Sequence, residues 1–157
     1  MYSKAVMAGS ARVPHREREL VNWTDFGRVR AELGAGFLRI LGYFREDGDK
    51  AITAVEQAFR DRNAAALVIP AHTLKGESAQ FGAWRLSAMA EEIEMTARRC
   101  VEFRESPEEL IETVVALRPC FTETMAELDR EANPLVPRRP VFGRRVDPRP
   151  ATFGRAG

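Results

Sequence analysis

One histidine stands in a segment whose residue types suit phosphoryl chemistry, His72-Thr73-Leu74-Lys75-Gly76. On an α-helix, positions three and four residues further on lie one turn away on the same face, so Lys75 and Gly76 would flank His72. An imidazole has an ordinary pKa of about 6.5, so at neutral pH it is mostly an uncharged nucleophile. Lysine supplies positive charge for phosphoryl oxygens, and glycine leaves the backbone open to a partner. The segment therefore predicts a site that handles a phosphoryl group.

Three apolar residues share this part of the helical wheel. Val68 and Ile69 fall one turn before His72 and could form an apolar docking patch. Ala79 falls almost in line with His72 two turns further on and would extend a flat surface. Ordinary interpretations stay open, since an isolated helix histidine is usually a partly exposed side chain and Lys75 alone would be a solvated lysine.

Two nearby residues complicate a regular helix. Pro70 removes one backbone hydrogen bond and clashes with the preceding turn, at a cost of about 3 kcal/mol, so the helix either kinks there or begins there. Glu77 lies about 140° around the helix from His72 and should leave the reacting face open. The acidic residues of the next segment are interpreted as a solvated face with salt bridges along the helix: Glu91, Glu92 and Glu94.

Apolar residues at steps of three and four predict five helices. The first is short, with an N-cap at Thr24 and an end at Gly34. The expected ranges of the others are 36–61, 63–81, 84–99 and 106–132. Gly48 leaves open whether the second helix is continuous or breaks. The last helix begins with a capping-box pattern, Ser106-Pro107-Glu108-Glu109.

These helices predict an all-α fold, an antiparallel up-and-down four-helix bundle with a short extra N-terminal helix. The bundle is expected over residues 23–132, with Phe81 and Trp84 in its core. Residues 1–22 are expected to be a flexible N-terminal segment. Residues 133–157 are rich in arginine and proline and predict a disordered tail.

Charge is unevenly distributed along the 157 residues, although the formal net charge is only +1. Residues 24–131 carry 14 Lys and Arg against 20 Asp and Glu, whereas residues 132–157 carry 6 against 1. An acidic folded part argues against nucleic acid as the main ligand of the domain. The basic tail could bind nucleic acid, anionic lipid or an acidic partner, or act only as a solubilising end.

Several other classes of protein are disfavoured. No apolar run approaches about 18 residues, so we expect no membrane span, and the first ten residues do not resemble a signal peptide. Cys100 and Cys120 lack metal-ligand spacing and are interpreted as idle thiols of a cytoplasmic protein. A carboxylate-bridged di-metal bundle needs a glutamate three residues before a histidine, but Ile69 stands there before His72. We therefore expect no metal site.

The histidine segment, with Ala79 and Phe81-Gly82-Ala83 after it, resembles the signature of histidine-containing phosphotransfer (HPt) domains of bacterial phosphorelays. The family pattern is His-x-Leu-Lys-Gly, then small residues, then an apolar residue and glycine. Glu94 falls where the family often has a Leu-Glu pair, with Ile93 in place of the leucine. The resemblance covers roughly residues 20–130 and includes the helix count. Glu77, at a usually small position, and Pro70 are departures from the pattern.

The resemblance implies a phosphocarrier in which His72 accepts a phosphoryl group from the phosphoaspartate of a receiver domain and passes it to another receiver. Lys75 would then steady the phosphoryl charge and Gly76 would give the partner access. Response-regulator receiver domains and a hybrid histidine kinase are the implied partners, with Mg²⁺ on the receiver and no cofactor in this chain. A monomer without its own ATP site, and therefore no enzyme, is expected.

A second hypothesis is a non-catalytic interaction module that binds receivers or a helical partner while His72 is never phosphorylated. Pro70 and Glu77 are its grounds in the sequence. A histidine kinase fits poorly, because the chain has no glycine-rich nucleotide-binding segment. In addition, Thr73 stands where kinase dimerisation domains commonly place an acid.

Overall fold

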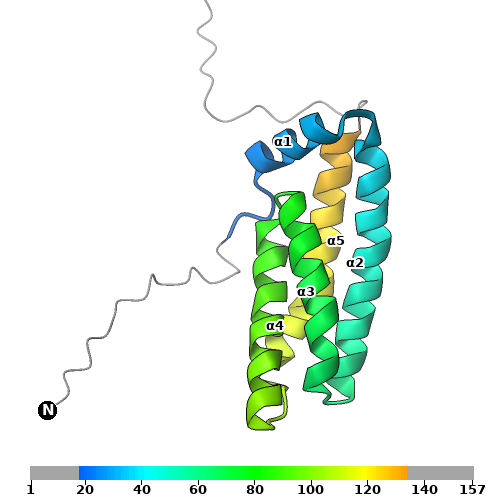
Figure 1. Cartoon of the computed structure of the whole chain (residues 1–157). Helices are drawn as coiled ribbons and strands as arrows, with labels where there is room; N and C mark the ends of the chain where they lie inside the picture. The colour runs from blue at the N-terminus through cyan, green and yellow to red at the C-terminus, as the bar shows by residue number, and fades with distance from the viewer. Residues whose placement is uncertain (1–17, 134–157) are drawn as a thin grey trace, which may run out of the picture.

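A computed structural model describes residues 18–133, which form five α-helices and two short 3₁₀ turns. Four helices stand side by side as an up-and-down bundle (Figure 1): α2 (Phe37–Arg60), α3 (Ala64–Gln80), α4 (Trp84–Phe103) and α5 (Ile111–Ala132). Both α3 and α5 pack against α2 and α4, so α3 and α5 are diagonal neighbours. The predicted all-α bundle with an extra N-terminal helix is confirmed. The predictions for residues 1–17 and 134–157 lie outside the described residues.

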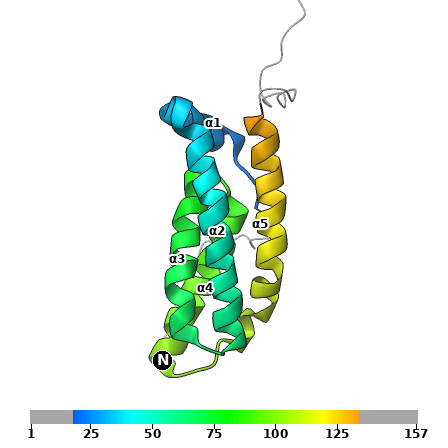
Figure 2. The ribbon, with the colours of Figure 1, turned by 90° about the vertical axis from the view of Figure 1, so that its right-hand side faces the viewer.

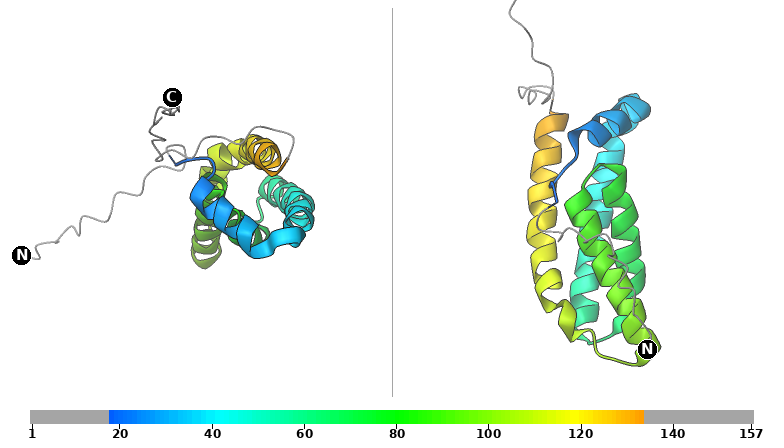
Figure 3. Two further views of the ribbon diagram at one scale, coloured as in Figure 1. Left: turned by 90° about the horizontal axis from the view of Figure 1, so that it is seen from above. Right: turned by 90° about the vertical axis from the view of Figure 1, so that its left-hand side faces the viewer.

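The extra helix, α1 (Trp23–Leu33), crosses one end of the bundle (Figures 2 and 3). Its N-cap is Asn22, whose side-chain oxygen accepts a hydrogen bond from the Asp25 amide at 3.0 Å, so the predicted cap at Thr24 is wrong. Asn22 is fixed there because its own amide donates to the Gly82 carbonyl at 2.8 Å. The helix ends at Gly34, as predicted, with a φ of +51° that glycine tolerates.

The long helix α2 is continuous through Gly48, which settles the alternative of a break. A methyl group on this glycine would lie 2.6 Å from a ring carbon of Phe121 on α5. Glycine is therefore needed for close packing of the two helices. The contact with the phenyl ring offsets the roughly 1 kcal/mol that glycine costs in a helix.

Helix α3 is also continuous, with Pro70 inside it. It begins after Asn63, the predicted cap, whose side-chain oxygen accepts from the Ala66 amide at 3.1 Å. A buried row on one side anchors the helix to the core: Leu67, Ala71, Leu74 and Ser78. Packing of this row maintains the helix across the hydrogen bond that Pro70 cannot make.

Two predicted boundaries are wrong at the other end of the bundle. Helix α4 continues past Arg99 to Phe103 and ends where Arg104 takes a left-handed conformation. The predicted capping box does not form, because a 3₁₀ turn at Glu108–Leu110 precedes α5 and no side chain caps either element. The turn instead buries Leu110, so core packing decides the local backbone.

Aromatic rings connect the end cap to the middle of the bundle. Phe26 of α1 contacts Phe37, which contacts Phe81, and Phe81 stacks on Phe44 with ring centroids 5.1 Å apart. Phe81 is buried, as predicted. The prediction that Trp84 belongs to the core is wrong, because it is 38% exposed and its indole N–H donates to an Asp25 carboxylate oxygen at 2.7 Å.

Candidate functional site

His72 projects from the exposed side of α3, with 62% of its side chain accessible. Its sequence neighbours Ala71 and Leu74 are fully buried and fix the helix rotation. The imidazole lies at the edge between α3 and α4, which pack along one another. The ring is therefore held on a rigid element while one edge faces solvent.

A buried carboxylate of α4 contacts the inner edge of this ring. Oε1 of Glu94 lies 2.9 Å from His72 Nδ1, although the Glu94 side chain is only 4% exposed. The same oxygen accepts from Arg98 Nη2 at 2.9 Å and Nε at 3.2 Å. The other oxygen, Oε2, pairs with Lys75 Nζ at 2.7 Å. Four side chains from two helices thus form one cluster.

The charge state of Glu94 follows from these contacts. Burial opposes ionisation, but hydrogen bonds from Lys75, Arg98 and His72 outweigh it and lower the pKa of Glu94 to about 2. At neutral pH this group is a carboxylate, which can only accept hydrogen bonds. The hydrogen in the contact with His72 must therefore sit on Nδ1. In the neutral ring, Nε2 then carries the free lone pair.

The prediction that Glu94 belongs to a solvated face is wrong. Its neighbours on the helical wheel, Ala90 and Ala97, are both fully buried, so the carboxylate sits at the edge of the core. The sequence contains this signal, because Glu94 has an alanine four residues before it and another three residues after it. Such spacing places the glutamate on the same helix face as two small apolar residues. Arg98 is a further member of the site that the sequence motif does not include, and it lies one turn after Glu94 on the same face of α4.

The other predicted site residues lie around His72 as helical geometry requires. Lys75 shares the Glu94 carboxylate, so its ammonium group is held close to the imidazole. Gly76 is exposed, and a methyl group built on it would meet no atom of the described residues within 4 Å beyond the adjacent residues and the backbone of α3. Ile69 is 76% exposed, whereas Val68 and Ala79 are half-buried, so Ile69 dominates the apolar part of this face.

Glu77 faces the opposite side of α3. Burial, together with the nearby Asp47 carboxylate of α2, raises the pKa of Glu77. Its place beside α2 separates it from the Glu94 cluster on α4. The geometry thus agrees with the expectation that Glu77 leaves the exposed edge of His72 open.

Other kinds of site are not found in the described part of the chain. Between residues 18 and 133, no group of three or more His, Cys, Asp or Glu side chains is arranged to hold a metal ion. Within the same range, no helix is both long and apolar enough to cross a membrane. Cys100 and Cys120 are buried free thiols.

Comparison with known families identifies the bundle. A family model described as the Hpt domain matches residues 39–132, which is more than half of the chain. The chain belongs to the Hpt domain family. Hpt domains are phosphocarriers of phosphorelays, so a phosphotransfer role in two-component signalling, rather than catalysis, follows from membership.

A solved structure supports the fold independently. The crystal structure of histidine-containing phosphotransfer protein B (HptB) from Pseudomonas aeruginosa PAO1 matches with a TM-score of 0.63 at 20% sequence identity. The alignment covers 71% of this chain and 93% of that protein. A comparison with curated proteins finds no match. The Hpt match begins inside α2, so α1 and the segment before it lie outside the matched residues.

Proposed function

We propose that His72 is the phosphoacceptor of this Hpt domain and that Nε2 is the reacting atom. It receives the phosphoryl group from a receiver-domain phosphoaspartate and passes it to the aspartate of another receiver. The observation that carries this proposal is the contact between His72 Nδ1 and the buried Glu94 carboxylate, which occupies one ring nitrogen and leaves the exposed one free.

The transfer needs no proton movement within this chain. The Nε2 lone pair attacks phosphorus, the Nε2–P bond forms, and the bond from phosphorus to the aspartate oxygen breaks. Aspartate leaves as a carboxylate. The ring keeps its hydrogen on Nδ1 and becomes a phosphoimidazolium, whose positive charge lies against the Glu94 carboxylate. Onward transfer reverses these steps, and neutral imidazole leaves.

The cations around Glu94 support the same assignment. Lys75 and Arg98 both hold Glu94 before transfer, at 2.7 and 2.9 Å. Arg98 keeps over half of its side chain exposed, so it can also reach an incoming anion. Charge neutralisation and positioning are the main requirements of phosphoryl transfer. Lys75 and Arg98 therefore stabilise the phosphoryl oxygens once the group arrives on His72.

The exposed face of α3 suits a receiver partner. Gly76 leaves backbone accessible one turn after His72, and Ile69 offers apolar surface one turn before it. A small footprint of this kind fits a transient complex that must form and separate at each transfer. Mg²⁺ belongs to the receiver in this scheme, since the His72 cluster offers two cations and a single carboxylate that is already paired with both of them.

The test is transfer of labelled phosphate from a phosphorylated receiver domain in the presence of Mg²⁺. We expect acid-labile, alkali-stable label on the wild-type chain and none on His72→Gln. A matched control is the second histidine, because His15→Gln should be labelled like the wild type. Tight receiver binding without any label on the wild-type chain would instead support the non-catalytic interaction module.

A further inference from the structure

The solvent-facing side of α3 carries no acidic residue, lysine or arginine in its first three turns. Residues 64–74 contain no Asp, Glu, Lys or Arg, although five of them are exposed: Ala65, Ala66, Ile69, His72 and Thr73. The other three helices of the bundle each expose several charged side chains. A surface helix normally has a polar outer face, whereas a helix that is apolar all round is covered on both sides. The outer side of α3 therefore has the composition of a surface that another molecule covers.

Val101 of α4 extends this apolar surface onto the neighbouring helix. It follows Glu94 by seven residues, so it lies almost in line with Glu94 two turns further along α4. Glu94 is buried beneath α3, whereas Val101 is 48% exposed. Because α3 and α4 run antiparallel and Glu94 contacts His72, Val101 faces the part of α3 two turns before His72, at Ala65. The small alanine side chain leaves the valine open to solvent.

These residues form one apolar area beside the histidine, here called the α3–α4 patch: Ala65, Val68, Ile69 and Val101. Ile69 is 76% exposed, and Val68 is partly buried against the core. The patch begins one turn before His72 and extends about 10 Å along α3. Over the same distance on the other side of His72, the chain has the charged residues Lys75 and Glu77. The large exposed apolar side chains of α3 thus lie on one side of the imidazole only.

The position of the patch indicates its occupant. Membership of the Hpt family implies receiver domains or kinases of two-component systems as partners. A transient complex buries less than about 1,200 Å² in total, so each partner contributes about 600 Å², which equals a disc with a radius of about 14 Å. A partner centred on His72 therefore covers the whole patch. A molecule that occupied this face permanently would prevent any transfer to or from the imidazole.

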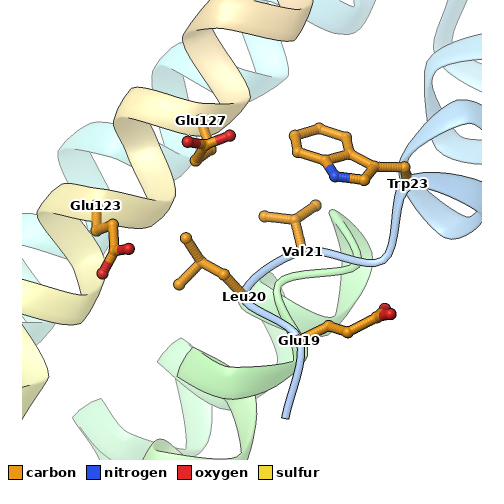
Figure 4. A pocket seen from close by; sticks show the side chains of 6 residues that line it. All are labelled: Glu19, Leu20, Val21, Trp23, Glu123 and Glu127. Carbon is orange, nitrogen blue, oxygen red and sulfur yellow. The ribbon is translucent and has the colours of Figure 1, made fainter. Parts of the chain in front are cut away.

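A pocket elsewhere on the molecule does not suit this partner. Figure 4 shows Leu20, Val21 and Trp23 facing Glu123 and Glu127 of α5. Val21 is buried, Leu20 packs against the core, and Glu127 is already paired with an arginine of its own helix. The pocket lies on α5, the diagonal neighbour of α3. A receiver docked there would not reach His72.

We propose that the α3–α4 patch is the apolar centre of the receiver-binding surface and that Val101 helps to determine which receivers bind. The proposal rests on His72 being the phosphoacceptor. The matching surface of the receiver is apolar, since a charged side chain placed against the patch would lose its water without gaining a partner. The patch binds the receiver equally well before and during transfer, so it sets the receiver concentration that is needed and leaves the maximal rate unchanged.

The test is single-turnover phosphotransfer from a phosphorylated receiver domain with Mg²⁺, with the rate measured against receiver concentration. In Ile69→Asn/Val101→Asn, the concentration that gives half the maximal rate should rise about tenfold or more, because two apolar side chains no longer leave water on docking. The maximal rate should stay the same, since the cluster around Glu94 is unaltered. The matched control Ile111→Asn/Val115→Asn makes the same replacements at exposed positions of α5 and should change neither quantity.

Four results would overturn the proposal. An unchanged half-saturating concentration in Ile69→Asn/Val101→Asn is the first, and an equal rise in the control variant is the second. The third is a lower maximal rate together with a changed ¹⁵N spectrum of the His72 ring, which would show that the patch supports the site itself. The fourth is a wild-type dimer that Ile69→Asn/Val101→Asn dissociates while transfer is unchanged, which would assign the patch to a second copy.

Titration of receiver binding without transfer separates this proposal from the role of His72. A wild-type chain that binds the receiver through the patch but is never labelled would overturn the phosphoacceptor and retain the patch. Label on His72, with equal receiver binding by the wild type and Ile69→Asn/Val101→Asn, would overturn the patch and retain the phosphoacceptor.

Discussion

At the scale of single residues, Glu94 decides which imidazole nitrogen of His72 is available. A free imidazole places its hydrogen on either nitrogen, but a buried carboxylate 2.9 Å from Nδ1 requires the hydrogen on that atom. The carboxylate is itself paired with Lys75 and Arg98, which fix its position. The fixed Glu94 carboxylate accepts the hydrogen bond from Nδ1 of His72. The lone pair on Nε2 is therefore available to act as a nucleophile.

Replacement of this carboxylate gives the first prediction. In Glu94→Ala we expect the His72 hydrogen to redistribute towards Nε2, seen in ¹⁵N NMR spectra of the ring. Phosphotransfer should slow by about tenfold or more, because a hydrogen bond to a charged group contributes about 1.5–3 kcal/mol. Glu91→Ala removes an exposed carboxylate of the same helix and should change neither quantity. An unchanged ¹⁵N spectrum in Glu94→Ala would contradict the assigned role.

Gly76 gives a second prediction, in which stability and function change in opposite directions. Apart from the backbone of α3 itself and the two adjacent residues, no atom of residues 18–133 lies within 4 Å of a methyl group at this position, so Gly76→Ala should stabilise the fold by up to about 1 kcal/mol. Transfer from the receiver should nevertheless fall, because the methyl group occupies the face that the partner approaches. Denaturant unfolding and labelled-phosphate transfer measure the two effects.

Gly42 of α2 provides the matched control. It is also a helical glycine at which an added methyl group would meet, among the described residues, nothing within 4 Å beyond its own helix backbone and adjacent residues. Gly42→Ala should show the same gain in stability with unchanged transfer. Equal transfer rates in Gly76→Ala and the wild type would show that Gly76 is only a weak point of the helix.

At the scale of elements, close contacts between helices explain features that local propensity cannot. Gly48 interrupts the predicted apolar pattern of α2, yet the helix is continuous because Phe121 of α5 occupies the space of the missing side chain. Gly82, within the family motif, has a φ of +73°, and a methyl group there would lie 2.7 Å from the Asn22 carbonyl oxygen. The motif thus also positions the start of α1.

Gly48→Ala is the third prediction. Alanine is the better helix former, but its methyl group would overlap the Phe121 ring at 2.6 Å. We expect a loss of about 1–3 kcal/mol, typical of overpacking, whereas Gly42→Ala in the same helix gains stability. Urea unfolding of both variants checks the difference. A gain in stability for Gly48→Ala would contradict this prediction, because it would show that the Phe121 ring or the spacing of α2 and α5 adjusts to the added methyl group without cost.

The helices could be predicted from the sequence wherever an apolar row is long, as in α2 and α3. The boundaries failed where a tertiary contact chose between local signals, as at Asn22, which the Gly82 carbonyl holds, and at Leu110, which is buried before α5 begins. The candidate site residues His72, Lys75 and Gly76 could be predicted together from the sequence because they lie on one helix, α3. Glu94 was not predicted as part of the site because His72 and Lys75, its partners on α3, lie on a different helix, and Arg98 joins the site only through Glu94, one turn away on α4.

At the scale of the whole molecule, the Glu94 cluster connects the site to acid stability. The folded pKa of Glu94 is about 2, well below its ordinary value of 4.5, so its stabilising contribution is present above pH 4.5 and is lost as pH falls towards 2. The shift corresponds to about 3 kcal/mol at neutral pH. The candidate site is thus also a stabilising contact between α3 and α4.

The fourth prediction follows from this linkage. Glu94→Gln should be less stable than the wild type at pH 7, and the difference should shrink as pH falls from 4.5 towards 2. The contribution of Glu77 to stability changes with pH in the opposite direction. Its pKa is raised by burial, so the fold loses stability as pH rises above 4.5 and Glu77 ionises. Glu77→Gln should therefore gain stability at pH 7. Unfolding free energies measured from pH 7 down to pH 2 test both signs, Glu77→Gln above pH 4.5 and Glu94→Gln below it, and a pH-independent difference for Glu94→Gln would contradict the first.

The most direct test of the central claim is to locate the phosphorus atom on the ring. A ¹⁵N-labelled chain, phosphorylated by a receiver domain with Mg²⁺, is studied by ¹⁵N–³¹P correlation NMR spectroscopy. We predict that phosphorus is bonded to Nε2 of His72 while Nδ1 keeps its hydrogen. Phosphorus on Nδ1, on another residue, or absent from the chain altogether would contradict the account.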